Sequence, residues 1–351
     1  MKKIVAILMT LAMLLSLCAC GAAEAPAATE APAAAPEAPA VEAPAEEAPK
    51  MEPMALKFAC AEPGSGTYVK EITAALEKVT EYTGGAMTFE IFPDNQLGTI
   101  TDVMESVNAG APIIESVGFD QLGDIVPEFM PASFPYIFQD IYEVYDLAAS
   151  DWMVDMTAKV QATGITPIVL GAGGYRHFIS TEPIYDASSI QGKIIRMGPS
   201  GAAQGFIKVM NGTPTTSTWG DNYSLLQTGT FHACEANLEA LWVASFHEVC
   251  DYLTLSGHFV TPCALIISND YWNQIPADVQ AYMVEVLTEA QRNTTDASMA
   301  SEGDYVEKFK EAGVEVIETD KSTFASYVPA LFELMELDPA IYDEIRAAIE
   351  G

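Results

Sequence analysis

Within residues 56–117, short apolar runs typical of strands alternate with segments whose apolar residues repeat at helical spacing. This alternation limits the possible folds more than any other feature of the chain. Short apolar runs are typical of strands, whereas Ile72, Leu76 and Val79 repeat at helical spacing between two of them. Strands are expected over 56–59, 87–91 and 112–117, and helices over 67–82 and 99–108. This β-α-β-α-β order predicts an α/β fold with a parallel sheet covered by helices.

The alternation of strands and helices continues toward the C-terminal end. Further strands are expected near 166–170, 193–197, 263–267 and 314–317, and helices over 201–210, over 223–228 and from Pro276 onward. The region after residue 53 has about 300 residues, enough for two lobes with separate cores. Periodicity alone does not distinguish an enzyme from a two-lobed binding protein.

The N-terminal residues are expected to form an export signal and not a part of the folded body. Two lysines precede an apolar run over residues 4–17, which has the length of a signal-peptide core and is short for a membrane span. Cys20 follows Ala19 in a sequence that resembles a bacterial lipobox. We therefore predict a signal peptide over 1–19 and lipidation of Cys20. A plain secretory signal with cleavage nearby is the alternative.

Residues 20–53 are expected to form a tether, because nearly all residues after Cys20 are Ala, Glu or Pro. Such a segment has no large apolar side chains for a core, and frequent proline keeps it extended. A tether directly after a lipidated cysteine would hold the folded body at the outer face of the cell membrane. The expected location is therefore extracytoplasmic, with a lipid anchor in the membrane.

The charge balance excludes several classes of partner. The chain has 16 Lys and Arg against 49 Asp and Glu, a formal net charge of −33. A polyanion such as nucleic acid would be repelled, so no nucleic-acid partner is expected. Adhesion to anionic lipid through a basic patch is excluded by the same argument.

Motifs for catalysis, metals and cofactors are missing from the sequence. There is no phosphate-binding loop, no dinucleotide-binding glycine pattern and no Gly-x-Ser-x-Gly elbow. The cysteines beyond the signal region match no zinc spacing, and we expect buried free thiols at Cys60, Cys234, Cys250 and Cys263. We therefore predict a protein that is not an enzyme, with no catalytic residues, metal or cofactor.

Arginine is scarce in this chain, and two of its four arginines lie close together in the sequence, at Arg176 and Arg196. Residues 79–158 contain neither Lys nor Arg. A guanidinium group grips a carboxylate with two parallel hydrogen bonds, and Arg196 ends an apolar strand, where α/β proteins usually bind ligands. The alternative is that both arginines pair with neighbouring acidic residues.

Several short motifs, in a fixed order, resemble the extracytoplasmic solute receptors of tripartite ATP-independent periplasmic (TRAP) transporters, the DctP-type family. The matching segments are Thr83-Gly84-Gly85, Ile91-Phe92-Pro93, Gln96-Leu97-Gly98, Phe134-Pro135-Tyr136-Ile137-Phe138, Gly174-Tyr175-Arg176, residues 190–196, Leu226-Gln227-Thr228-Gly229 and Glu235-Ala236-Asn237. The resemblance covers nearly all of residues 55–320. It implies a receptor that delivers a small organic acid to one small and one large membrane subunit of a TRAP-type secondary transporter.

The resemblance also implies an architecture, a two-lobed fold of the periplasmic-binding-protein type. The ligand would lie in a cleft between the lobes, which crossing segments and a long helix would connect. We expect lobe 1 to comprise residues 54–173 and 262–301, and lobe 2 to comprise residues 174–261 and 302–351.

The family pattern assigns ligand-binding roles to four residues of the second lobe. Arg196 matches the arginine that pairs with the ligand carboxylate, and Arg176 matches a second arginine that supports it. Asn237 matches a side chain that hydrogen-bonds the same carboxylate. Trp219 falls where the family often places an aromatic residue that packs on the ligand.

The first-lobe side of the expected site is less defined. Glu115 and Glu62 lie at or near contact positions where the family varies, and surface acids are the alternative interpretation of both. The segment after Ala109 lacks the acidic residue that this block usually has. The ligand is therefore left open among sugar acids, dicarboxylates, keto acids and aromatic acids.

Three other functions remain compatible with these patterns. The chain could be a receptor of an ABC importer, a secreted lipoprotein enzyme, or a ligand sensor that partners a signalling receptor. A gene pair for one small and one large membrane protein beside this gene would favour the TRAP interpretation over the ABC importer.

Overall fold

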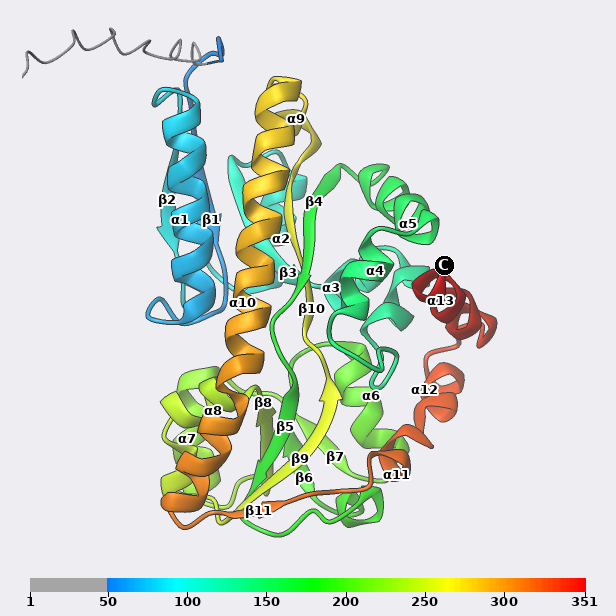
Figure 1. Ribbon diagram of the computed structural model, residues 1–351. Helices are drawn as coiled ribbons and strands as arrows, with labels where there is room; N and C mark the ends of the chain where they lie inside the picture. Colours follow the sequence, from blue (N-terminus) through cyan, green and yellow to red (C-terminus); the bar gives the residue numbers. More distant parts are fainter. Residues whose placement is uncertain (1–48) are drawn as a thin grey trace, which may run out of the picture. The chain divides into compact units, whose positions relative to one another are not determined.

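The computed structural model describes residues 49–351. The predicted signal peptide, Cys20 and nearly all of the predicted tether lie outside the described residues. The described chain forms two sheets with helices packed against them, which confirms the predicted α/β fold with two lobes (Figure 1). Each sheet is mixed, and each helps to position one side of the candidate site.

The first sheet has the strand order β2-β1-β3-β10-β4. Its strands are β1 (Met54–Ala59), β2 (Met87–Phe92), β3 (Ile113–Gly118), β4 (Ile165–Ala172) and β10 (Pro262–Ser268). The strand β1 pairs in parallel with β2 and β3, as predicted. The direction of β10 was not predicted, and this strand is antiparallel to both neighbours because it enters from the other sheet.

The second sheet has the order β11-β9-β5-β8-β6-β7. Its strands are β5 (Arg176–Ser180), β6 (Ile194–Arg196), β7 (Thr213–Thr215), β8 (Ala233–Ala236), β9 (Tyr252–Phe259) and β11 (Glu315–Ile317). The strands β7, β6 and β8 are parallel, whereas β5 is antiparallel to both β8 and β9. The strands β5, β7, β8 and β9 were not predicted.

Helices cover the sheets as the alternating pattern requires. They are α1 (Thr67–Tyr82), α2 (Ile100–Asn108), α3 (Phe119–Ile125), α4 (Glu143–Ala148), α5 (Asp151–Gln161), α6 (Gly201–Val209), α7 (Asn222–Gln227), α8 (Leu238–Val243), α9 (Asn269–Trp272), α10 (Ala277–Glu311), α11 (Lys321–Ala325), α12 (Val328–Leu334) and α13 (Ala340–Glu350). The bounds of α1 match the prediction, and its residues Ile72, Leu76 and Val79 are buried. The helix α2 begins with a capping box formed by Thr99 and Asp102, which fixes its start.

The two sheets are linked by crossing segments and by one long helix. The chain passes from β4 to β5 and back from β9 to β10, and the two crossings are bonded together, since the Gly173 N–H donates to the Thr261 carbonyl over 3.0 Å. Gly174 has a φ of +117°, and a Cβ there would lie 2.3 Å from the Ser298 hydroxyl, so only glycine fits. The helix α10 contacts α1 and β4, and farther along it contacts α8 and β11 (Figure 1).

The C-terminal helices pack on elements of both sheets. The helix α12 contacts α6, whereas α13 contacts α4, α5 and the 3-10 helix Pro127–Ser133. Arg346 of α13 forms an ion pair with Glu143 of α4 at 2.6 Å. The packing of α13 on first-lobe elements departs from the assignment of all residues 302–351 to lobe 2, and the lobe boundaries as a whole stay a prediction.

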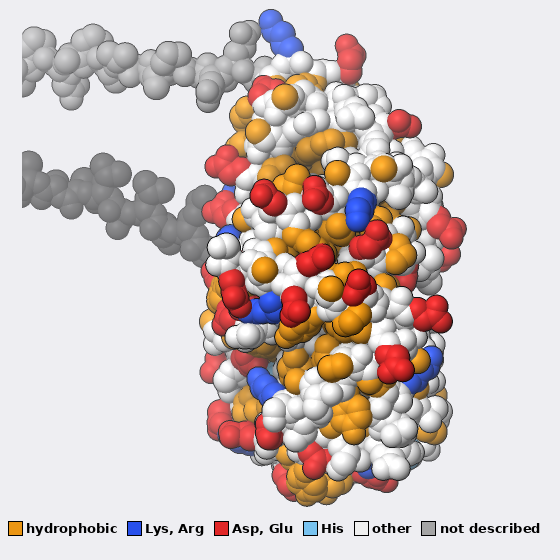
Figure 2. Space-filling model, turned by 90° about the vertical axis from the view of Figure 1, so that its right-hand side faces the viewer, with side chains coloured by type: hydrophobic (Ala, Val, Ile, Leu, Met, Phe, Trp, Pro, Cys, Tyr) orange, Lys and Arg blue, Asp and Glu red, His pale blue; other side chains and the backbone are white. Residues whose placement is uncertain are grey.

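Two further findings concern the surface and the thiols. Acidic side chains are spread along the face shown in Figure 2, and Lys and Arg are fewer there, in line with the composition. No helix within residues 49–351 has the length and apolar character needed to cross a membrane. All four predicted thiols are free and buried, as expected.

Candidate functional site

The strand ends of the second sheet bring the predicted ligand-binding residues to one edge. Arg196 is the last residue of β6, and Asn237 directly follows β8, its parallel neighbour. The loop after β7, the other parallel neighbour, leads to Trp219. Because β5 is antiparallel to β8, its first residue, Arg176, lies at this same edge. Ligands of open α/β sheets usually bind beyond such carboxyl ends.

Arg196 is buried with its hydrogen-bonding capacity largely unused. Only 9% of the residue is exposed. One guanidinium nitrogen, Nη2, donates to the Ser217 carbonyl over 3.0 Å, but Nε is sealed from solvent and has no partner. The guanidinium carbon lies 5.5 Å from the Trp219 ring centre. No acidic side chain within residues 49–351 forms an ion pair with it, so Arg196 is a buried cation without an anion.

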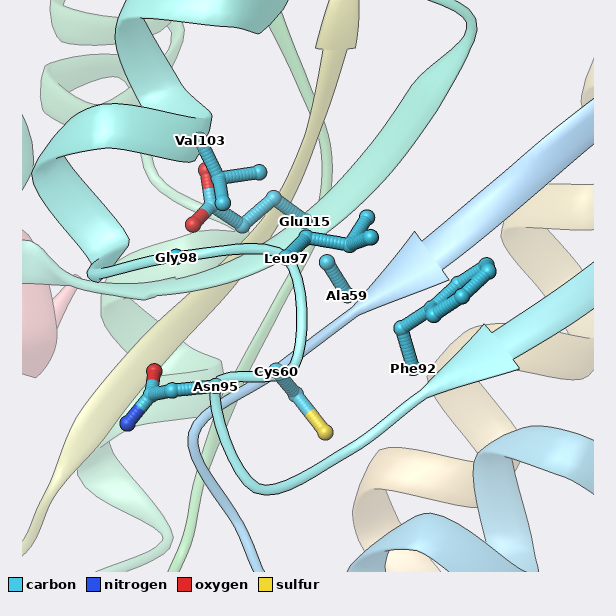
Figure 3. A pocket seen from close by; sticks show the side chains of 8 residues that line it. All are labelled: Ala59, Cys60, Phe92, Asn95, Leu97, Gly98, Val103 and Glu115. Carbon is cyan, nitrogen blue, oxygen red and sulfur yellow. The ribbon is translucent and has the colours of Figure 1, made fainter.

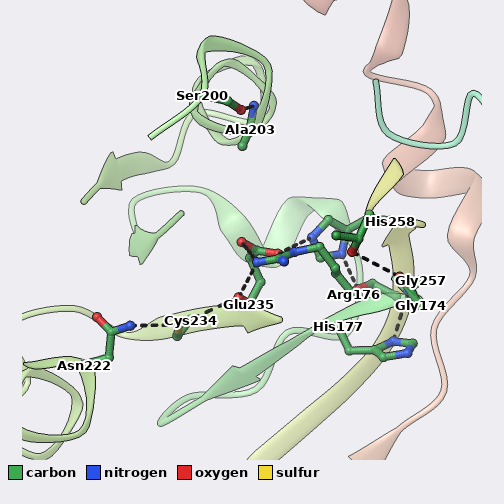
Figure 4. A network of polar contacts seen from close by, with 12 residues as sticks. Gly174, Arg176, His177, Ser200, Ala203, Asn222, Cys234, Glu235, Gly257 and His258 are labelled. Carbon is green, nitrogen blue, oxygen red and sulfur yellow. Dashed lines mark hydrogen bonds and ion pairs between the residues drawn. The ribbon is translucent and has the colours of Figure 1, made fainter. Parts of the chain in front are cut away.

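Arg176 is paired, in contrast to Arg196. Its Nε donates to Oε2 of Glu235, and its Nη2 donates to Oε1 over 2.8 Å and to the Glu235 carbonyl over 3.1 Å (Figure 4). Burial alone would raise the pKa of Glu235, but Arg176, together with His258 at 3.7 Å, holds this pKa well below its usual range. The alternative of acidic partners therefore holds for Arg176 and fails for Arg196.

Asn237 has two separate uses for its amide group. It is the N-cap of α8, and its Oδ1 accepts a hydrogen bond from the Ala240 N–H over 2.8 Å. The side-chain NH₂ group makes no hydrogen bond to any described residue. A helix cap that fixes the oxygen therefore leaves a donor free at the same strand edge as Arg196.

Two acidic residues in segments that follow strands of the first sheet are close enough to Arg176 for its charge to affect their pKa. Glu62 follows β1, and Asp120 lies in the first turn of α3, directly after β3. Burial raises the pKa of both carboxyl groups, and the positive charge of Arg176 opposes the rise. The side chain of Ser200, the N-cap of α6, also opposes the rise in the pKa of Asp120. These interactions place the carboxyl-end edge of the first sheet opposite that of the second.

Glu115 lies apart from the arginines, in a small pocket of the first sheet (Figure 3). It is only 2% exposed, and its Oε2 is buried without a hydrogen-bond partner among the described residues. Burial raises the pKa of Glu115 to about 9. The other pocket-lining residues are Ala59, Cys60, Phe92, Asn95, Leu97, Gly98 and Val103.

The structure thus gathers Arg196, Arg176, Asn237 and Trp219 at one strand edge, with Glu62 facing Arg176 and Glu115 in a separate pocket. The contacts of Glu235, His258 and Asp120 were not predicted. Glu235 stands beside Asn237 in a matching motif, but nothing in that motif shows that it neutralises Arg176. One feature of the sequence could have identified Asp120, which is its position shortly after a predicted strand. The ligand-binding roles themselves stay predictions.

Residues 59–336 match the family model of the bacterial extracellular solute-binding proteins, family 7 (DctP), and the chain belongs to this family. The match covers most of the folded body, and it confirms the resemblance to the receptors of TRAP transporters. The family consists of solute-binding proteins that act outside the cytoplasm, which agrees with the predicted class of function.

Individual relatives are distant in sequence and close in fold. The C4-dicarboxylate-binding periplasmic protein of Rhodobacter capsulatus is 22% identical over 263 residues, 75% of this chain and 79% of the relative. A TRAP periplasmic solute-binding protein of Actinobacillus succinogenes, solved with L-galactonate, has a TM-score of 0.79 at 27% identity, covering 85% of this chain and 99% of the other. One from Desulfovibrio salexigens, solved with diglycerolphosphate, has a TM-score of 0.79 at 24% identity, covering 85% and 97%.

Proposed function

We propose that this chain captures a small organic acid between its two sheets and delivers it to the small and large membrane subunits of a TRAP-type transporter. The observation that supports this most is the state of Arg196, a buried cation that has an unpartnered Nε–H and no ion pair with an acidic side chain among the described residues. A buried positive charge is costly unless an anion pairs with it. A ligand carboxylate would supply that anion.

The surrounding groups favour a carboxylate held by one cation. Arg176 is already neutralised by Glu235, so a single positive charge remains for the ligand. The free NH₂ group of Asn237 adds an uncharged donor at the same edge. Of the three relatives described above, one binds a C4-dicarboxylate and two were solved with L-galactonate and diglycerolphosphate, and all three of these ligands are acids.

The binding energy of such a site is sufficient for a receptor that catalyses no reaction. Hydrogen bonds to a charged group contribute about 1.5–3 kcal/mol each. A receptor with a Kd between about 1 μM and 1 nM needs roughly 8–12 kcal/mol, which these bonds and apolar packing on Trp219 can supply together. Closure of the two lobes would then signal occupancy to the membrane subunits. We therefore propose a binding protein and not an enzyme.

A thermal-shift screen over a library of organic acids and neutral sugars tests the proposal. An acid present at 100 times its Kd adds about 2.7 kcal/mol to the stability of the folded state, enough to raise Tm by about 5 °C. We expect at least one monocarboxylic acid to do so. Shifts by neutral sugars alone would contradict the proposal.

The variant Asn237→Asp distinguishes the helix-capping role of Asn237 from its predicted contact with the ligand. Aspartate is as good an N-cap as asparagine, so we expect Tm of the free protein to change by less than about 2 °C. The new carboxylate accepts hydrogen bonds but cannot donate one, and it repels the ligand carboxylate. Calorimetry should therefore show affinity for the acid lowered at least about tenfold. An unchanged affinity would remove Asn237 from the site.

The membrane anchor is a separate part of the proposal. The lipobox-like sequence that ends in Cys20, followed by the Ala/Glu/Pro-rich segment, supports lipidation at Cys20. Cys20→Ser should release the exported protein from the membrane fraction, while Cys18→Ser, the matched control, should leave it there. Fractionation that shows both variants still in the membrane would contradict the assignment.

A further inference from the structure

Asn222 is a polar residue that the fold buries completely beside an apolar core cluster. It is the first residue of α7, and none of it is exposed to solvent. Leu226, one turn farther along α7, and Cys234 of β8 both belong to the core cluster. The side chain of Asn222 does not cap α7. Because a buried amide is costly and an apolar side chain of similar size would avoid that cost, the amide group calls for a role of its own.

The two ends of this amide group connect the loop after β7 with strand β8. The Ser217 hydroxyl donates to Oδ1 of Asn222 over 2.5 Å. The Nδ2 group of Asn222 points at β8 and donates to the Cys234 sulfur, a weak acceptor, over 3.9 Å (Figure 4). Ser217 lies two residues beyond β7, and Cys234 is the register partner of Arg196 on β6. Since β6 lies between β7 and β8, the link spans the end of the strand that carries Arg196.

The loop after β7 supplies two groups that contact the guanidinium group of Arg196. The Ser217 carbonyl accepts a hydrogen bond from Nη2 over 3.0 Å, and the Trp219 ring centre lies 5.5 Å from the guanidinium carbon. Because a guanidinium group is planar, fixing Nη2 also limits the directions in which Nε–H can point. Residues 216–221 are mostly exposed, so the position of this loop depends on anchors such as the bond from Ser217 to the buried Asn222.

The link holds Arg196 without adding a charge to the site. Burial raises the pKa of the Cys234 thiol to about 12, although the charge of Arg196 opposes the rise, so this thiol is uncharged at neutral pH. The amide of Asn222 and the hydroxyl of Ser217 carry no charge either. The positive charge of Arg196 is therefore left for an anionic ligand.

We propose that Asn222 is a positioning residue for the bound acid, which holds Ser217 and thereby aims the Nε–H of Arg196 at the ligand carboxylate. This inference rests on the proposed function, in which Arg196 binds that carboxylate. Asn222 itself does not touch the ligand. It keeps the guanidinium group and the Trp219 ring in one arrangement before the ligand arrives, and such preorganisation lowers the entropic cost of binding.

Calorimetry on variants of the link tests this inference, with L-galactonate as the probe, or with the acid that gives the largest thermal shift if L-galactonate does not bind. Ser217→Ala keeps the carbonyl and removes the hydroxyl, whereas Asn222→Leu has a similar volume without the acceptor. Each should lower the affinity at least about fivefold. The double variant should bind no more weakly than the weaker single variant, because both changes remove the same bond. Ser217→Thr keeps the hydroxyl and should restore the binding.

A matched control lies in the same loop. The Thr218 hydroxyl bonds to Asp221 over 2.6 Å, a contact within the loop that does not reach the body of the lobe. Thr218→Ala should therefore leave the affinity within about twofold of the original. Unchanged affinity in Ser217→Ala would overturn the inference, and this variant decides alone if Asn222→Leu does not fold. Losses that add in the double variant would also overturn it.

The Nε–H of Arg196 gives a second readout, which needs no ligand. The chain has only four arginines, so the arginine Nε–H signals in a proton–nitrogen NMR spectrum are few, and comparison with Arg196→Lys assigns this one. We expect slow exchange with water in the original chain, because Nε is sealed from solvent. Ser217→Ala should exchange this proton at least about fivefold faster than Thr218→Ala does. Equal exchange in these two variants would overturn the inference.

The two levels of the proposal fail in different ways. If no organic acid binds, or if binding does not depend on Arg196, the proposed function itself is wrong. If an acid binds and needs Arg196 but is indifferent to Ser217→Ala and Asn222→Leu, the carboxylate site stands and only the role of Asn222 fails.

Discussion

Arg196→Ala is expected to abolish measurable binding of the organic acid while the protein stays folded. Removing one partner of a buried, hydrogen-bonded charge pair costs about 2–5 kcal/mol, a loss of about 30-fold to several thousand-fold in affinity. Stability should not fall, because among the described residues Arg196 has no acidic partner and donates only to the Ser217 carbonyl. Isothermal titration and thermal melting of the same sample measure both effects.

Two matched variants sharpen this experiment. Arg196→Lys keeps the charge but loses the planar fork, so it should also bind much more weakly. Arg292→Ala is the control, because it removes an exposed arginine whose guanidinium carbon lies 4.1 Å from the centre of the Tyr145 ring. This variant should bind the acid as the original protein does. Unchanged affinity in Arg196→Ala would refute the assignment of the carboxylate to this residue.

Arg176→Leu is expected to destabilise the protein strongly, unlike Arg196→Ala. The change leaves the Glu235 carboxylate, which is 1% exposed, without its main partner. Breaking a buried ion pair in this way costs about 3–5 kcal/mol, and chemical denaturation should show the loss at neutral pH. The double variant Arg176→Leu/Glu235→Leu should recover much of it, because no unpaired charge remains. A stable Arg176→Leu would show that the pair is not important for the fold.

The stability that the Arg176–Glu235 ion pair contributes should decrease as the pH falls. The folded protein holds the pKa of Glu235 far below its ordinary value of 4.5, so the pair contributes stability above that value. The contribution is lost as the pH falls below 4.5 toward the depressed pKa of the folded state. The stability of the original chain relative to that of the double variant should therefore fall in acid. A relative stability that rises in acid would contradict the depressed pKa.

The sequence predicted elements with a clear amphipathic period and failed for those without one. The helix α1 has an unbroken stripe of apolar residues, and its bounds are as predicted. Strand β9 is buried along most of its length, so no alternation of exposed and buried residues reveals it. The antiparallel entry of β10 depends on the crossing from β9, and the local pattern of a strand does not report its direction.

The candidate site was predictable only in part, because the pairing and burial of its side chains depend on contacts between distant parts of the chain. The composition of the chain drew attention to Arg176 and Arg196, but it could not tell the paired arginine from the unpaired one. Glu235 lies 59 residues from Arg176 and is one of 49 acidic residues, so its role depends on the register of β5 against β8. The unsatisfied state of Glu115 likewise follows from burial, which only the fold determines.

A crystal structure of the complex with the tightest-binding acid from the screen tests the central claim most directly. The account predicts that the ligand carboxylate accepts two hydrogen bonds from the Arg196 guanidinium group and one from the NH₂ group of Asn237. A ligand bound between the sheets with its carboxylate elsewhere, and with Arg196 still bonded only to the Ser217 carbonyl, would contradict it.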